Sequence, residues 1–206
     1  VWAWRCRCCD DGRKCAHCPV PSGAPHAPLL PMPPESIARS TSSASAAAPP
    51  RPEGFQRVAE ALRRLGHEHE PLWLEVAACT SQEAADALGV GLGQIAKSVV
   101  FRRKADDQPV LVIASGDRRV DEARLPALVG PVGRADASYV KARTGFAIGG
   151  VSPVALADGA TLLLDAQLQR FDRIWAAAGH PNGVFRLTPE ALQRLTGAPR
   201  AEVVFQ

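Results

Sequence analysis

The chain has 206 residues, 46% of them hydrophobic and 22% charged, which is the composition of a folded protein with one ordinary core. The formal charge of +3 belongs to residues 1–52, while residues 53–206 carry 18 basic and 18 acidic side chains, a balance that argues against a DNA-binding protein with a strongly basic face. No apolar run reaches the roughly 18–20 residues of a membrane-spanning helix, so we expect no membrane partner.

The first 52 residues differ in composition from the rest, with 10 of the 18 prolines and 5 of the 6 cysteines. They end in a low-complexity stretch of Ser, Ala and Pro, so we expect residues 1–52 to be a disordered tail before a domain over 53–206. Because the only methionine is Met32, a spurious N-terminal extension is a second interpretation. A third is a zinc knuckle, although one C-x-x-C pair is a weak signal. Cys79 is the only cysteine after the tail, which fits a reducing cytoplasm.

Helical and strand patterns alternate along the first half of the domain. Apolar residues three or four apart predict an amphipathic helix that Gly66 closes. Thr80 and Glu83 form a capping-box pattern that opens a second helix, which Gly89 stops. Two β-branched runs joined by a polar loop predict an antiparallel hairpin. The expected elements are helices over 55–65 and 80–88 and strands over 72–76, 95–101 and 110–114.

The second half of the domain continues in the same mixed order. Asp121 and Asp136 predict the caps of two short helices. Thr188 and Pro189 predict the start of a last helix, which Gly197 ends. The expected elements are helices over 121–128, 136–143 and 188–196 and strands over 144–148, 161–164, 174–177, 184–187 and 201–205. Without a regular βαβ repeat, this order predicts an α+β fold with a curved mixed sheet.

Familiar hydrolytic and phosphate-binding motifs are missing from the chain. There is no G-x-S-x-G nucleophile elbow and no glycine-rich phosphate loop. His67 and His69 lie at a helix end, where they form either a solvated charged turn or part of a metal site whose other ligands are not evident. Lys97 begins an apolar strand, in a chain with only 4 lysines among 24 basic residues. It is either a strand-edge residue whose charge reaches water, or a point cation that holds a phosphate or ester oxygen.

A second feature is the run Gly149-Gly150-Val151-Ser152-Pro153, which follows a short apolar stretch. Glycines let the backbone adopt positive φ and let a ligand approach the main chain. Successive N–H groups in such a turn can form an anion-binding nest. With Pro153 fixing its far end, the loop is a candidate oxyanion cradle. The alternative is an ordinary Gly-Gly turn.

Lys97 and the Gly149–Pro153 loop occur together and in this order. Their flanks read QIAKS over 94–98 and TGF over 144–146. With these motifs, residues 55–205 closely resemble the YbaK/prolyl-tRNA synthetase-associated editing-domain family. The resemblance implies a mixed, barrel-like sheet surrounded by helices. It also implies a freestanding deacylase that hydrolyses the ester between an amino acid and the terminal adenosine of tRNA without a metal or other cofactor.

The resemblance further implies roles for individual residues. Lys97 matches the family's essential lysine, which is expected to bind the terminal phosphate or the amino-acid end and to orient the ester. The loop amides are expected to hold the carbonyl oxygen, and the nucleophile is expected to be water or a hydroxyl of the tRNA. The implied site residues are Lys97, Gly149 and Gly150 as catalytic groups and Val151, Ser152, Pro153, Thr80 and His180 as substrate-binding groups.

Residues 177–185 depart from the cysteine-specific members of the family, which carry a serine and an aspartate there. Removal of cysteine by its own thiol is therefore not expected as the main activity, and an apolar pocket suits alanine or another small residue. We expect a trans-editing hydrolase that acts on the acceptor end of tRNA-Pro carrying a small amino acid, with prolyl-tRNA synthetase as a partner. The alternative is a non-catalytic module of the same fold that binds tRNA or a synthetase.

Overall fold

The computed structural model describes residues 50–157 and 159–205, which belong to the compact unit Pro50–Gln206. The interpretations of the tail as disordered, spurious or zinc-binding concern residues 1–49, which lie outside the described residues. The domain boundary after residue 52 stays a prediction. Within the described ranges, no helix has both the length and the apolar character needed to cross a membrane.

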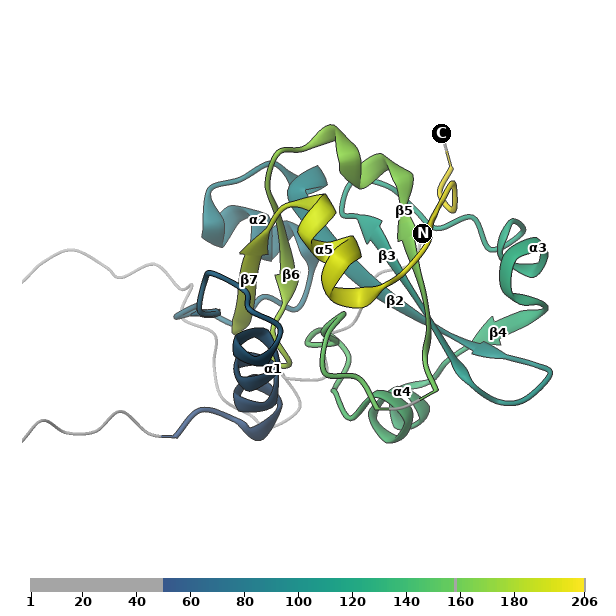
Figure 1. Cartoon of the computed structure of the whole chain (residues 1–206), viewed down its shortest axis with the longest axis horizontal. Helices are drawn as coiled ribbons and strands as arrows, with labels where there is room; N and C mark the ends of the chain where they lie inside the picture. The colour runs from purple at the N-terminus through teal and green to yellow at the C-terminus, as the bar shows by residue number, and fades with distance from the viewer. Residues whose placement is uncertain (1–49, 158, 206) are drawn as a thin grey trace, which may run out of the picture. The chain divides into compact units, whose positions relative to one another are not determined.

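The fold is built on an eight-stranded mixed sheet with helices packed around it (Figure 1). The strands are β1 (Leu72–Trp73), β2 (Ile95–Arg103), β3 (Pro109–Ser115), β4 (Val132–Arg134), β5 (Thr161–Asp165), β6 (Ile174–Ala177), β7 (Gly183–Leu187) and β8 (Arg200–Ala201). Their order is β1-β7-β6-β2-β3-β5-β8, and β4 pairs with the far end of β2. β2 runs antiparallel to β3 but parallel to β6, and β3 runs parallel to β5. The mixed sheet confirms the predicted α+β class.

The β2–β3 hairpin lies inside this sheet and confirms the strand pair predicted from its β-branched runs. In its register, Lys97 lies opposite Ala114. All seven residues of β3 are buried, because core clusters cover both of its faces. Leu111 and Ile113 pack in one cluster and Val112 in the other. The backbone that carries Lys97 is therefore held against a fully buried strand.

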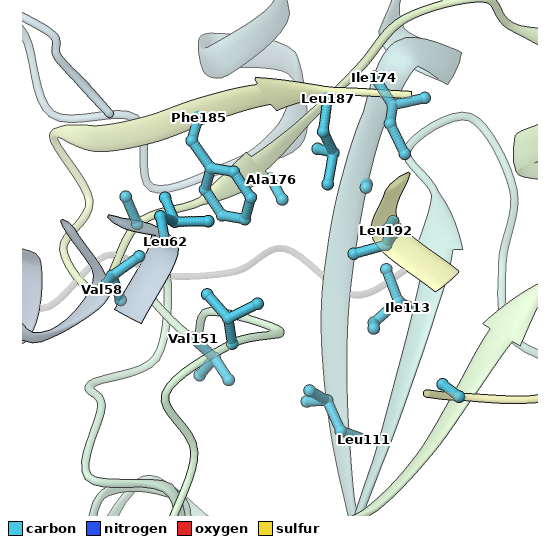
Figure 2. Packing of buried hydrophobic residues seen from close by; sticks show 14 of the residues in the cluster. Val58, Leu62, Leu111, Ile113, Val151, Ile174, Ala176, Phe185, Leu187 and Leu192 are labelled. Atoms are coloured by element: carbon cyan, nitrogen blue, oxygen red, sulfur yellow. The ribbon is translucent and has the colours of Figure 1, made fainter. Parts of the chain in front are cut away.

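The helices of the described residues pack apolar side chains against the sheet. They are α1 (Glu53–Arg64), α2 (Ser81–Leu88), α3 (Leu125–Val129), α4 (Ala137–Thr144) and α5 (Pro189–Thr196), with 3-10 turns η2 (Leu92–Gln94) and η3 (Ala166–Arg170). α1 places Val58 and Leu62 in the main core near Phe185 and Val151 (Figure 2). Truncating a fully buried leucine such as Leu62 costs about 2–5 kcal/mol, so α1 is an integral part of the domain.

Three predicted helix caps are confirmed. Thr80 Oγ1 accepts the Glu83 N–H at 3.1 Å, and the Glu83 carboxylate accepts the Thr80 N–H at 3.0 Å. Asp136 and Thr188 accept N–H groups at the starts of α4 and α5. The capping box fixes not only α2 but also the residues just before it, which border the site described below.

Two predicted strands are wrong in length. The strand expected over 72–76 has only the two residues of β1. The strand expected over 201–205 contains only the end of β8, after which Val204 forms an isolated bridge to Val120. Val203 and Val204 are buried in a core cluster without a continuous ladder. An apolar run therefore looks like a strand even where it packs as a loop.

Two further predictions are wrong around α3 and α4. Asp121 does not cap a helix but pairs with Arg124 in a turn at 3.1 Å, and α3 begins at Leu125. Residues 144–148 do not form a strand, because α4 continues through Thr144 and turns follow it. The sequence does not predict β4 either, since three residues with a central glycine carry little strand signal.

Candidate active site

The first half of the glycine loop lies against two other segments of the chain. Gly149 has φ +89°, and a Cβ there would lie 3.9 Å from the Cα of Cys79. At Gly150 a Cβ would lie 2.7–2.9 Å from the main chain of His180, so only glycine fits. The Gly150 N–H donates to the Ala147 carbonyl at 3.0 Å, which closes the turn. The structure thus brings Gly149, Gly150 and His180 together.

The second half of the loop is anchored in the core. Val151, Ser152 and Pro153 are all buried. Ser152 Oγ accepts the N–H of Val154 at 3.3 Å, and Val151 packs in the same cluster as Val58 (Figure 2). Because the burial of these three residues includes their main chain, this half of the loop anchors the turn in the core. The predicted loop therefore consists of a glycine half and an anchoring half.

The His180 ring is fixed in orientation by two neighbours. It stacks on Trp73 with ring centroids 4.9 Å apart and an angle of 22° between the planes. Its Nδ1 accepts the Asn182 N–H at 3.2 Å, so the neutral ring carries its proton on Nε2. Burial lowers the pKa of His180 from its ordinary value of 6.5, which favours the neutral form. His180 is therefore a neutral hydrogen-bond donor through Nε2.

Thr80 follows Cys79 in the chain, and its hydroxyl accepts an N–H as the cap of α2. The Glu83 carboxylate also accepts the N–H of Cys79 at 2.7 Å, which fixes the residue that Gly149 approaches. One residue earlier, the Ala78 N–H donates to the Pro181 carbonyl at 3.0 Å. Thr80 is exposed and its hydroxyl keeps its own proton to donate, so its contact with substrate stays a prediction.

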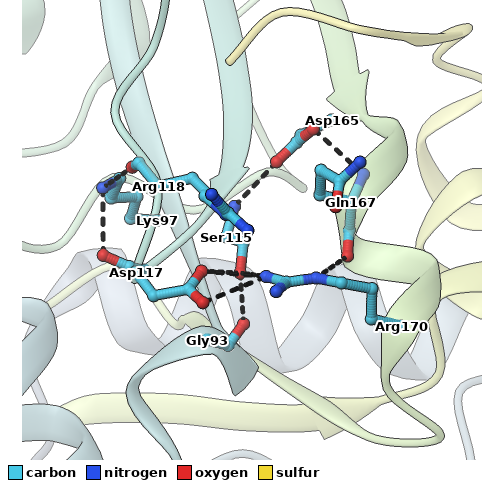
Figure 3. Close-up of polar contacts among 9 residues, drawn as sticks. Gly93, Lys97, Ser115, Asp117, Arg118, Asp165, Gln167 and Arg170 are labelled. Atoms are coloured by element: carbon cyan, nitrogen blue, oxygen red, sulfur yellow. Dashed lines mark hydrogen bonds and ion pairs between the residues drawn. The ribbon is translucent and has the colours of Figure 1, made fainter. Parts of the chain in front are cut away.

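Lys97 is half-buried on β2, and main-chain oxygens hold its ammonium. Nζ donates to the Gly116 carbonyl at 3.1 Å and to the Arg118 carbonyl (Figure 3). An ammonium has three N–H groups, so one is left for a ligand. Burial lowers the pKa of Lys97, while the negative charges of Asp117 and Asp165 oppose this shift. The side chain is therefore a held cation, not an edge residue that extends into water.

Two relationships bear on where Lys97 lies relative to the loop. Ile95 packs in the same cluster as Ala78, and because strand side chains alternate, Lys97 leaves β2 on the same face as Ile95. β2 also pairs with β6, which leads directly into the segment that carries His180. The hydrogen bonds of Lys97 go to the turn after β3. Its convergence with the glycine loop on one substrate therefore stays a prediction.

His67 and His69 pack against β7 instead of joining this site. His67 Nε2 lies 2.9 Å from the Arg186 carbonyl oxygen, and His69 Nε2 lies 3.0 Å from Arg186 Nη2. In the described part of the chain, no group of three or more His, Cys, Asp and Glu is arranged to hold a metal. A surface depression along α1, between Arg51 and Glu70, includes none of the predicted site residues.

Sequence reasoning misses two groups that lie beside these residues. Trp73 belongs to a two-residue strand, and only the pairing of β1 with β7 brings it near His180. Asp117 and Arg170 form an ion pair at 2.9 Å next to the turn that holds Lys97 (Figure 3). The local signal for this turn is Gly116, because a glycine at the end of a buried strand often marks a close approach of two backbones.

Comparison with known proteins gives a consistent likeness. Residues 75–195 match the family described as "Aminoacyl-tRNA editing domain". The "Uncharacterized protein YwhH" of Bacillus subtilis is 35% identical over 130 residues, which are 63% of this chain and 82% of that protein. The "Putative Cys-tRNA(Pro)/Cys-tRNA(Cys) deacylase EbsC" of Enterococcus faecalis is 28% identical over 138 residues, 66% of this chain and 83% of that protein.

A solved structure gives the same likeness in three dimensions. The "Crystal structure of a putative trans-editing enzyme for prolyl tRNA synthetase" has a TM-score of 0.71 and 37% sequence identity with this chain. The match covers 76% of this chain and 100% of that one. The family match over residues 75–195 includes every site residue that the sequence predicts.

Proposed function

This chain belongs to the aminoacyl-tRNA editing-domain family, and on that premise we propose that it is a trans-editing hydrolase that removes a wrongly attached amino acid from tRNA. The observation that carries the proposal is the close approach of the Gly150 main chain to His180, with Gly149 next to Pro181 and Cys79. Lys97 adds a held cation with one N–H left for a ligand. Main-chain donors, a neutral donor ring and a fixed cation are groups that support ester hydrolysis without a protein nucleophile.

In the proposed reaction, a water molecule oriented by a hydroxyl of the tRNA attacks the carbonyl carbon of the ester. The carbonyl oxygen gains negative charge and accepts hydrogen bonds from N–H groups of the glycine loop. Because Ala147 accepts the Gly150 N–H and residues 151–153 are buried, we assign this role to the N–H of Gly149, which is the exposed residue of the loop. The bond to the ribose oxygen then breaks and that oxygen takes the proton that water loses. The products are the free amino acid and the deacylated tRNA.

Lys97 and His180 are proposed to orient the substrate. The Lys97 ammonium binds the terminal phosphate or the amino-acid end with its remaining N–H, and so fixes one end of the ester. His180 donates from Nε2 to a substrate oxygen, since its Nδ1 is occupied by Asn182. Both groups are held by the protein before substrate arrives, which reduces the reorganisation needed in the transition state.

We propose tRNA-Pro carrying a small amino acid such as alanine as the substrate. The names of related proteins refer to Cys-tRNA(Pro) and to prolyl-tRNA synthetase, which supports this tRNA and that synthetase as the source of the error. Residues 177–185 lack the serine and aspartate of the cysteine-specific relatives, which supports a small side chain without a thiol. The proposed place of action is the cytoplasm, where translation uses these tRNAs.

The test is deacylation of tRNA-Pro charged with a panel of small amino acids. Lys97→Ala is expected to lower kcat/KM about a hundredfold or more while the fold is retained. Lys104→Ala is the matched control, because Lys104 is an exposed lysine just after β2. Full activity in Lys97→Ala would show that Lys97 has no part in the reaction.

A non-catalytic tRNA- or synthetase-binding module is the second candidate. The observation in its favour is that Lys97 already donates to two carbonyls, as a structural lysine would. Multiple-turnover kinetics separate the two functions. Release of several amino acids per protein molecule supports the hydrolase, and tight tRNA binding without release supports the module.

A further inference from the structure

The turn after β3 is fixed by a polar cluster that joins three segments (Figure 3). Arg170 Nη2 donates to the Asp117 carboxylate at 2.9 and 3.2 Å and to Ser115 Oγ at 3.0 Å. Ser115 Oγ lies 2.6 Å from the Gly93 carbonyl oxygen and 2.7 Å from an Asp117 oxygen, so its one proton goes to one of them. Asp165 accepts the Ser115 N–H at 3.3 Å. The cluster thus connects η2, the end of β3 and η3.

This cluster surrounds the two carbonyls that hold Lys97. Asp117 stands between Gly116 and Arg118, whose carbonyls accept the two hydrogen bonds from Lys97 Nζ. A Cβ at Gly116 would lie 2.3 Å from the Leu92 carbonyl oxygen, so the turn packs directly on the chain that enters β2. A displacement of Asp117 would therefore move both oxygens that hold the ammonium.

We propose that Asp117 and Arg170 are positioning residues for deacylation: they hold the turn so that two carbonyls fix the Lys97 ammonium and its third N–H is left for the substrate. The inference rests on the function proposed above. The ion pair is 34% and 35% exposed on its two side chains. The pair is therefore partly buried, and Arg170 also donates to the buried Ser115 hydroxyl. Removing the pair is expected to cost some stability in addition to its effect on Lys97, so folding is measured alongside activity.

The same cluster determines the charge around Lys97. The charged groups near the ammonium and its turn are Asp117, Asp165, Arg118 and Arg170. Burial lowers the pKa of Lys97, and the two carboxylates raise it. Burial opposes ionisation of Asp117, but its hydrogen bonds and the two arginines outweigh burial and lower its pKa, so Asp117 is charged at neutral pH. Loss of that charge should lower the pKa of Lys97 further.

The test compares Asp117→Asn and Arg170→Met with Asp106→Asn in the full chain. Asp106 forms a comparable pair with Arg103 at 2.7 and 2.8 Å in the loop between β2 and β3, outside the cluster. One measurement is the pH at which Lys97 reacts with an amine-acylating reagent, followed by mass spectrometry. The other is kcat and KM for deacylation of alanyl-tRNA-Pro across pH, after subtraction of uncatalysed hydrolysis.

In Asp117→Asn, the labelling profile of Lys97 and the alkaline limb of kcat are expected to move together to lower pH. In Arg170→Met, the labelling profile of Lys97 is not expected to move to lower pH, because the change removes a positive charge. The kcat of this variant should fall about tenfold, with KM little changed. Arg170→Lys should recover part of this loss. Asp106→Asn should match the wild-type protein in both measurements.

A Lys97 labelling profile in Asp117→Asn that coincides with the wild type overturns the inference, and so does an unchanged kcat in Arg170→Met. If the profile shifts but the wild-type protein deacylates none of the tRNAs, the turn still holds Lys97 and the proposed function is what fails. Circular dichroism and thermal melting check that each variant folds. If Arg170→Met does not fold, the kcat of Arg170→Lys is compared with that of the wild-type protein instead, and an unchanged value overturns the inference.

Discussion

The indole ring of Trp73 lies flat against the imidazole of His180, with their centroids 4.9 Å apart. The Arg51 guanidinium lies 4.5 Å over the indole ring, and Phe55 meets it edge-on at 5.2 Å. Trp73 therefore links the start of α1 to the residue that contacts the glycine loop. This contact fixes the plane of the His180 ring.

Replacing Trp73 with alanine should free the His180 ring and lower kcat/KM for deacylation about tenfold. Trp73→Phe keeps an aromatic face and should lose less activity. Leu72→Ala is the control for shortening a side chain in β1, because Leu72 is 50% exposed. Equal losses in Trp73→Ala and Leu72→Ala, measured on the same mischarged tRNA, would contradict a role for the stacking.

The lowered pKa of His180 predicts a specific dependence of stability on pH. Burial keeps His180 neutral in the folded protein, whereas the unfolded chain takes up a proton near pH 6.5. The free energy of unfolding should therefore fall as the pH drops from about 6.5 to the lowered pKa. An NMR titration of the ring measures that pKa, and His180→Gln should remove this part of the pH dependence. A measured pKa of His180 at or above the ordinary value of 6.5 would contradict this prediction.

Gly150→Ala should damage both stability and activity. The added methyl group would overlap the His180 main chain at 2.7–2.9 Å, where no flexible side chain can give way. We expect a loss of about 1–3 kcal/mol in urea denaturation and a large loss of deacylation. Gly133→Ala is the control, because its nearest neighbour is the flexible Lys104 side chain at 3.6 Å. If Gly150→Ala were as stable as the wild-type protein, the close approach of Gly150 to the His180 main chain would be contradicted.

Thr80 and Thr188 form a matched pair for separating a helix cap from the site. Each hydroxyl accepts an N–H at 3.1 Å, from Glu83 at the start of α2 and from Ala191 at the start of α5. Each Thr→Ala change should cost about 1 kcal/mol of stability. Only Thr80→Ala should also lower deacylation, because the cap of α2 supports Cys79 beside the glycine loop. Similar activities of the two variants would show that Thr80 is a cap and nothing more.

The structural features that the sequence predicts well are those encoded over a few residues. The capping box at Thr80, the β2–β3 hairpin and the cap at Thr188 depend on neighbours in the chain, and all three are confirmed. Lys97 and the glycine loop stand out because two separate motifs occur in one order. The sequence signal is weaker where apolar residues pack without a ladder, as at Val203.

The contacts that sequence reasoning misses depend on strand pairing. Trp73 meets His180 only because β1 pairs with β7. Asp117 meets Arg170 only because β5, which leads into η3, lies parallel to β3. Single residues from distant segments have no local pattern, so these partners become visible only in the folded sheet.

The parallel pairing of β2 with β6 has a consequence during protein synthesis. A parallel pair cannot be closed by a tight turn, and the chain between these strands includes β3, β4 and β5. A ribosome must therefore translate most of the domain before β2 can pair with β6. Shortened nascent chains would expose the apolar strands instead, which makes them targets for chaperones and proteases rather than partly active hydrolases.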